Sequence, residues 1–104
     1  MPTDHTGVSL GVPKRVTPGL TVEEITPPSA AKYAVISAEG AAGKCAGTGT
    51  QTDGAVWSGD YKAIAVGADY TLQVDDGTEV VNGARTFFVG SDGASDVIVI
   101  QYVD

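Results

Sequence analysis

Acid–base or nucleophilic chemistry in this chain would depend on one histidine, His5, and one cysteine, Cys45. A catalytic base must lie within hydrogen-bonding reach of the group that it activates, and His5 is far in sequence from any cysteine or serine expected to pack in a core. We therefore expect His5 to be an exposed polar residue. The neighbouring Lys44 would favour the thiolate form of Cys45, but the sequence places no second base near it. We therefore expect Cys45 to be a small buried side chain or an inert thiol. We predict no catalytic residue and expect that the chain is not an enzyme.

One glycine-rich segment and two acidic turns contain some of the residues that a phosphate site or a metal site would need. Residues 40–45 (GAAGKC) contain the glycines and lysine of a phosphate-binding loop, but the glycines stand closer together than in that motif and its hydroxyl residue is missing. The acidic turns at residues 75–77 (DDG) and 92–96 (DGASD) contain carboxylates that suit calcium. Turn formation explains Asp and Gly there equally well. We predict no metal site and no cofactor, and calcium binding by the acidic turns stays open.

Three aromatic residues, Trp57, Tyr61 and Tyr70, lie near one another in the sequence. Together they would suit a platform on which a sugar ring stacks. Aromatic side chains of a small β-domain are more often part of its core. Quenching of Trp57 fluorescence by glycans would distinguish a carbohydrate-binding module from a packed tryptophan.

The net charge of −7 is unevenly distributed. Residues 1–32 carry equal numbers of basic and acidic side chains, so the excess of carboxylates lies in residues 33–104. A negative surface repels a phosphate backbone, so we expect no nucleic acid partner and favour a basic partner surface. Residues 1–10 lack the basic and apolar regions of a signal peptide, and no segment is apolar over the length of a membrane span, so we expect no membrane partner.

Prolines and aromatic residues divide the sequence into two parts. All five prolines lie within residues 1–28, and all seven aromatic residues lie between Tyr33 and Tyr102. Proline removes a backbone donor and extends the residue before it, so we predict an extended N-terminal arm over residues 1–32 and a β-domain over residues 33–104. The arm is rich in aliphatic residues, which favours binding to another protein, with a disordered tail as the alternative. The expected partner-binding residues are Val8, Leu10, Val12, Val16, Leu20, Val22 and Ile25.

If the arm is a separate tether, a chain without residues 1–26 should remain folded and soluble but should lose its attachment to the partner.

The β-domain is expected to consist of short strands separated by turns rich in glycine and aspartate. Residues 70–74 (YTLQV) alternate as in a half-buried strand, and Asn82-Gly83 predicts a type I′ hairpin. The other expected strands are residues 33–38, 55–57, 61–66, 78–81, 84–89 and 97–103. Residues 41–52 are expected to form a flexible loop. The pattern predicts an all-β fold, namely a small antiparallel β-sandwich or barrel preceded by the arm.

The last expected strand, residues 97–103 (VIVIQYV), is apolar on both faces. Such a strand is either central in a packed sheet or covered by another subunit. We assign Val97, Val99 and Tyr102 as candidate self-association residues. A domain of this size gains little stability from a single core, and one cysteine cannot form an internal disulfide, so we expect a homo-oligomer.

A short acidic chain with a proline-containing segment from Val12-Pro13 to Pro27-Pro28 and a compact β-body rich in glycine and alanine resembles the decoration, or cement, proteins on tailed-bacteriophage capsids. The resemblance lies in the overall organisation. It implies a structural virion protein, made in the host cytoplasm and bound to the capsid outer surface. Its partners would be the major capsid protein or other shell subunits, and a trimer would be the favoured oligomer. The alternatives are a small carbohydrate- or surface-binding β-module and another virion part, such as a tail or fibre component.

Overall fold

The computed structural model describes residues 3–47, 51–59, 61–74 and 86–104. Within these ranges the chain forms nine β-strands and no helix, so the expected all-β class is confirmed. The strands are β1 (Thr3–Asp4), β2 (Lys14–Val16), β3 (Glu23–Thr26), β4 (Tyr33–Glu39), β5 (Gly43–Ala46), β6 (Lys62–Ile64), β7 (Asp69–Gln73), β8 (Phe87–Ser91) and β9 (Val97–Val103).

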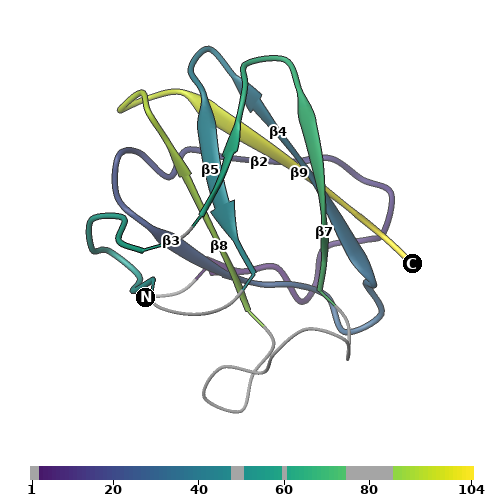
Figure 1. Cartoon of the computed structure of the whole chain (residues 1–104). Helices are drawn as coiled ribbons and strands as arrows, with labels where there is room; N and C mark the ends of the chain where they lie inside the picture. The colour runs from purple at the N-terminus through teal and green to yellow at the C-terminus, as the bar shows by residue number, and fades with distance from the viewer. Residues whose placement is uncertain (1–2, 48–50, 60, 75–85) are drawn as a thin grey trace.

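The strands form two sheets that pack face to face as a sandwich (Figure 1). The five-stranded sheet has the order β1-β3-β8-β5-β6, and the four-stranded sheet has the order β2-β9-β4-β7. All paired strands are antiparallel except β1 and β3, which are parallel. After β6 the chain crosses to the other sheet, where Val66 forms an isolated bridge with Ala38 of β4.

The core lies between the sheets and is built by alternate residues of their strands. β4 and β9 pair along their whole length of seven residues, and both show the alternation of a strand with one buried face. Their inward residues are Ala34, Ile36, Ala38, Ile98, Ile100 and Tyr102. The facing sheet contributes Ile25, Cys45, Ile64, Phe87 and Val89.

Residues 3–32 are part of this sandwich, which corrects the prediction of an extended arm separate from a domain that begins at residue 33. β2 pairs with β9 at one edge of the four-stranded sheet, and β3 pairs with β8 inside the five-stranded sheet. Residues 3–32 pair within the sandwich because the strand edges and apolar faces nearest to them belong to the same chain. The prolines do not prevent this, because Pro13 and Pro18 flank the short strand β2 and do not interrupt it.

The glycine-rich segment expected to be a loop contains β5, which lies between β8 and β6. A Cβ atom at Gly43 would lie 2.7 Å from Cδ1 of Ile98, so a larger residue there would force the Ile98 side chain to shift. The expected strand at residues 55–57 is absent, because those residues lie outside the nine strands. The Asn82-Gly83 hairpin and the strand at residues 78–81 lie outside the described residues.

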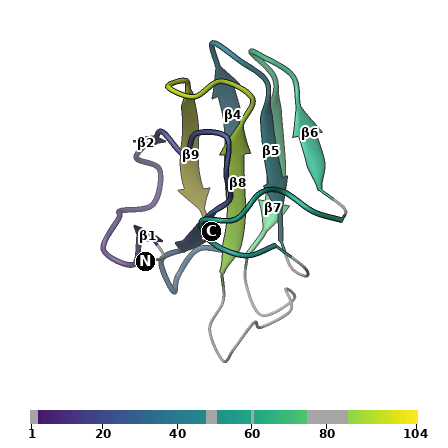
Figure 2. The ribbon, with the colours of Figure 1, turned by 90° about the vertical axis from the view of Figure 1, so that its left-hand side faces the viewer.

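Residues 51–59 form an extra layer on the outer face of the five-stranded sheet, where they cross β8 and β5 (Figure 2). The N–H of Gly54 donates to the carbonyl of Val22, and the N–H of Val22 donates to the carbonyl of Ala55, both at 2.8 Å. The N–H of Glu24 donates to the Asp53 carboxylate at 2.8 Å. Phe88 alternates with the inward residues of β8 and so faces this layer, yet only 1% of its surface is exposed. The layer therefore closes a small second core.

Candidate functional site

His5 is buried, which corrects the expectation of an exposed polar residue. Only 2% of its surface is exposed, and its Nδ1 lies 2.6 Å from the hydroxyl of Tyr102, close enough for a hydrogen bond. The two rings meet edge to face at 5.8 Å. Burial lowers the pKa of His5 and raises the pKa of Tyr102, so both side chains favour their neutral forms. The pair fastens the N-terminal segment to β9.

Cys45 points into the core from β5, as expected for a small buried side chain. Burial raises the pKa of its thiol to about 12. The thiolate, which is the nucleophilic form, is therefore strongly disfavoured near neutral pH. The only histidine and the only cysteine of the chain are therefore both buried side chains that pack inside the protein.

The aspartate side chains of the described acidic turn, residues 92–96, contact other residues of the same chain. Asp92 forms an ion pair with Lys44 of β5. The Asp96 side chain packs so closely against Gly93 that a Cβ atom there would lie 1.8 Å from Oδ2. Within the described ranges no group of three His, Cys, Asp or Glu residues could hold a metal ion. The other acidic turn, residues 75–77, lies outside the described residues.

Trp57 packs against the backbone of β8 at Gly90. A Cβ atom at Gly90 would lie only 2.2 Å from Nε1 of Trp57, so the indole uses the space that glycine leaves. Tyr61 meets the indole edge to face at 5.4 Å. Nε1 is buried and has no hydrogen-bond partner among the described residues. This arrangement favours the packed alternative for Trp57 over an open platform for a sugar.

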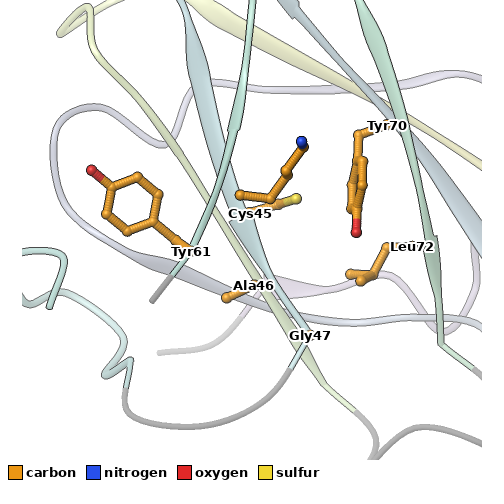
Figure 3. A pocket seen from close by; sticks show the side chains of 7 residues that line it. Cys45, Ala46, Gly47, Tyr61, Tyr70 and Leu72 are labelled. Carbon is orange, nitrogen blue, oxygen red and sulfur yellow. The ribbon is translucent and has the colours of Figure 1, made fainter. Parts of the chain in front are cut away.

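A pocket of about 330 Å³ lies between the two sheets on the side where β6 and β7 form their edges (Figure 3). Its wall is made by Tyr70 and Leu72 of β7 and by residues of β5 and β6. The ammonium group of Lys62 lies 5.6 Å from the centre of the Tyr70 ring, which is within cation–π range. The pocket lining combines polar and apolar surface.

The seven residues predicted to bind a partner do not form one surface. Val22 and Ile25 are buried at 2% and 0% exposure, so they belong to the protein's own core, and their assignment to partner binding is wrong. Val8, Leu10 and Val16 are partly buried against that core. Val12 and Leu20 are exposed, at 51% and 60%.

The predicted self-association residues are also divided by the structure. Tyr102 is fully buried and cannot contact another copy, which corrects its assignment. Val97 and Val99 lie on the opposite, outer face of the four-stranded sheet and are half-buried. β9 itself lies between β2 and β4, so it offers no free edge to a second copy.

Val97 and Val99 are part of a larger apolar surface, which we call the valine face. In the strand register Tyr33 pairs with Val103, whereas Val35 pairs with Gln101 and Val99 pairs with Ser37, so two polar side chains lie among the apolar ones. The members of the valine face are Tyr33, Val35, Val97, Val99 and Val103. The four valines are half-buried and Tyr33 is 39% exposed. Only Val97 and Val99 are predictable from the sequence, because the neighbours of the outward residues of β4 are defined only by the strand register.

An ion pair crosses β9 over the valine face. Arg15 of β2 lies opposite Val99, and Glu39 of β4 lies opposite Val97. The Arg15 guanidinium contacts both carboxylate oxygens of Glu39, at 2.6 and 3.4 Å. The pair neutralises its own charge and fixes two long side chains beside the valines.

Comparison with protein-family models, with curated protein sequences and with solved structures finds no match to this chain. No helix in the part of the chain that the structure describes is long and apolar enough to cross a membrane. The function proposed below therefore rests on the geometry of the molecule and on the resemblance in sequence organisation.

Proposed function

We propose that the chain is a structural virion protein that decorates and stabilises a capsid shell, and that it binds neighbouring shell subunits through the valine face. The observation that supports this proposal is the difference between the two outer faces of the sandwich. Residues 51–59 of the chain cross part of the outer face of the five-stranded sheet. The four-stranded sheet presents valines and a tyrosine outward, interspersed with Ser37 and Gln101.

Burial of this surface would stabilise a complex. Complete burial of a valine side chain contributes about 1.5–3 kcal/mol, and burial of the minor part that is still exposed contributes only a fraction of that. Four such valines together with Tyr33 would support a weak contact with one neighbour. A homo-oligomer of the chain would convert weak contacts into stable attachment, because binding by one subunit raises the effective concentration of the linked subunits at the shell.

The charges around the valine face indicate the kind of surface that it fits. Arg15 and Glu39 neutralise one another. Asp69 of β7 lies on the same outer face, since it pairs with Ser37, and Asp104 follows β9 at the border. We therefore expect a partner surface that is apolar at its centre and basic at its rim.

Antibodies raised against the purified chain provide the direct test of this function. In electron microscopy they should label the outer surface of particles purified from the source culture. Labelling confined to unassembled cell material, with unlabelled particles, would contradict the proposal.

A triple variant tests the face itself. Val35→Thr, Val99→Thr and Val103→Thr together keep β-branched side chains but replace apolar methyl groups with hydroxyl groups. We expect this variant to fold and to bind the particles at least tenfold more weakly in co-sedimentation. Val56→Thr is the matched control, because Val56 is 75% exposed on the layer that covers the other sheet. Equal loss of binding in the control, or full binding by the triple variant, would contradict the role of the valine face.

A further inference from the structure

The side chain of Lys62 starts on the inner face of the five-stranded sheet. Lys62 of β6 pairs with Cys45 of β5, and residues directly opposite one another in an antiparallel pair project from the same face. Cys45 is fully buried in the core between the sheets. β6 is the edge strand of its sheet, so Lys62 brings a positive charge to the border between the core and the surface.

The opposite sheet determines where the ammonium group of Lys62 lies. This group is 5.6 Å from the centre of the Tyr70 ring, and Tyr70 packs against the core from β7, the edge strand of the four-stranded sheet. Lys62 therefore reaches from the edge of one sheet to the edge of the other. The ion pairs among the described residues join Arg15 to Glu39 and Lys44 to Asp92, and neither includes Lys62.

The pocket between the sheets adjoins this lysine. Its volume of about 330 Å³ lies within the usual range for small-molecule sites, about 300–1,000 Å³. In Figure 3, Tyr70 and Leu72 lie on one side of the pocket and Cys45 on the other. The absence of a side chain at Gly47 leaves space beside Leu72, because a Cβ atom there would lie 3.2 Å from Cδ1 of Leu72.

We propose that this pocket binds a small molecule that has a planar apolar body and one carboxylate group. The carboxylate pairs with the Lys62 ammonium at the rim, and the planar body lies against the Tyr70 ring and Leu72. The proposal goes beyond capsid decoration, because it concerns a ligand inside a single chain and holds whether or not the chain binds a shell. An inward lysine on an edge strand also hinders pairing with another chain, but that role requires no pocket beside the lysine.

The charges of the pocket favour a single anionic group. Lys62 is the only charged residue among the described residues that line it. Burial raises the pKa of Cys45 to about 12, and the positive charge of Lys62 opposes that rise, so the charge acts inside the pocket as well as at its rim. The thiol stays neutral at that pKa and adds no competing anion.

The shape and chemistry of the walls favour a planar apolar body. An aromatic ring such as that of Tyr70 stacks against another planar ring in an offset arrangement. Leu72 adds aliphatic surface from the same strand. Tyr61, which lies at the other side of the pocket, is 44% exposed, so a ligand can reach the pocket from the surface.

Titration of the full chain with a matched pair of probes tests the proposal by ¹H–¹⁵N NMR. The first probe is 1-naphthoate, and the second is 1-naphthamide, which has the same rings without the charge. We expect 1-naphthoate to shift the amide signals of Cys45, Lys62 and Leu72 in a saturable manner. We expect 1-naphthamide to shift the same signals with lower affinity, because it lacks the ion pair.

Variants separate the contribution of the charge from that of the space. Lys62→Gln should weaken 1-naphthoate binding by about fivefold, as expected for a partly exposed ion pair, and should leave 1-naphthamide binding nearly unchanged. Lys14→Gln is the matched control, because it removes the same charge from β2 at the opposite edge of the four-stranded sheet. Gly47→Leu should weaken the binding of both probes, since its side chain occupies the space beside Leu72.

Three results would overturn the proposal. The first is the absence of a saturable shift at millimolar 1-naphthoate. The second is a set of shifts confined to the valine face or to other signals outside the pocket. The third is equal affinity of the wild type and Lys62→Gln for 1-naphthoate, or an equal loss of affinity in Lys14→Gln.

Discussion

At the scale of single residues, the contact between His5 and Tyr102 decides how the N-terminal segment is held. Both side chains are buried, and each is the hydrogen-bond partner that the structure gives the other. A buried polar group that loses its partner keeps its desolvation cost without compensation. The N-terminal segment should therefore be sensitive to changes at either residue.

Removing the Tyr102 hydroxyl tests this contact. We expect Tyr102→Phe to lower the free energy of unfolding by about 1–2 kcal/mol, because Nδ1 of His5 then stays buried without a partner. Urea unfolding followed by circular dichroism would measure the change. Tyr33→Phe is the control, since Tyr33 lies on the surface and its variant should differ little from the wild type. Equal stability of the wild type and Tyr102→Phe would contradict the importance of the contact.

The same burial makes stability depend on pH. The pKa of His5 is lowered in the folded chain relative to the ordinary value of 6.5. Below about pH 6.5 the unfolded chain therefore binds a proton that the folded chain does not, and the free energy of unfolding falls as the pH decreases toward the lowered pKa. Above pH 6.5 the contribution is constant.

Urea unfolding at pH 7.5 and pH 5.5 would measure this dependence. His5→Gln should show a smaller difference in unfolding free energy between these two pH values, because His5 is the only histidine in the chain. An unchanged difference in the variant would show that other groups cause the pH dependence.

At the scale of elements, the strands with long alternating patterns were predictable from the sequence, and the short ones were not. The strand expected at residues 97–103 matches β9, and the strand expected at residues 70–74 matches β7 to within one residue. β5 was missed because its inward residues include Gly43, whose lack of a side chain hides the alternation. The sequence could not show which sheet edge the short strand β2 would join, because three residues specify no partner.

The layer over the five-stranded sheet depends on one glycine. Gly90→Ala should displace Trp57, because the added Cβ would lie 2.2 Å from Nε1. We expect a loss of about 1–3 kcal/mol in the free energy of unfolding, together with a red shift and stronger acrylamide quenching of Trp57 fluorescence. Gly7→Ala is the matched control, since nothing lies within 4 Å of its added Cβ. Unchanged Trp57 fluorescence in Gly90→Ala would contradict the packing described for this layer.

At the scale of the whole molecule, the N-terminal third is a structural part of the sandwich and supplies β1, β2 and β3. His5 could not be placed from the sequence, because a single histidine among prolines has no pattern. The outward valines of β9 were predictable, but their continuation onto β4 required the register between the two strands. The candidate binding surface therefore became visible only in the assembled sheet.

Deletion of residues 1–26 distinguishes the sandwich from the tether expected from the sequence. The structure predicts that the deleted chain is unfolded or aggregated, because β8 loses its neighbour β3, and Phe87 loses the cover of Ile25, with which it pairs. Heteronuclear NMR of the deleted chain would show collapsed amide dispersion. A folded spectrum with the strand signals of the remaining residues would contradict the integral role of the N-terminal third.

The most direct test of the proposed attachment is a cryo-electron microscopy map of particles that carry the chain, at a resolution that separates β-strands. We predict density in which the outer face of β4 and β9, with Val35 and Val99, lies against a neighbouring shell subunit, while residues 3–32 remain folded in the sandwich. A map in which residues 3–32 leave the sandwich and extend across a neighbour, with the valine face directed to solvent, would contradict the account.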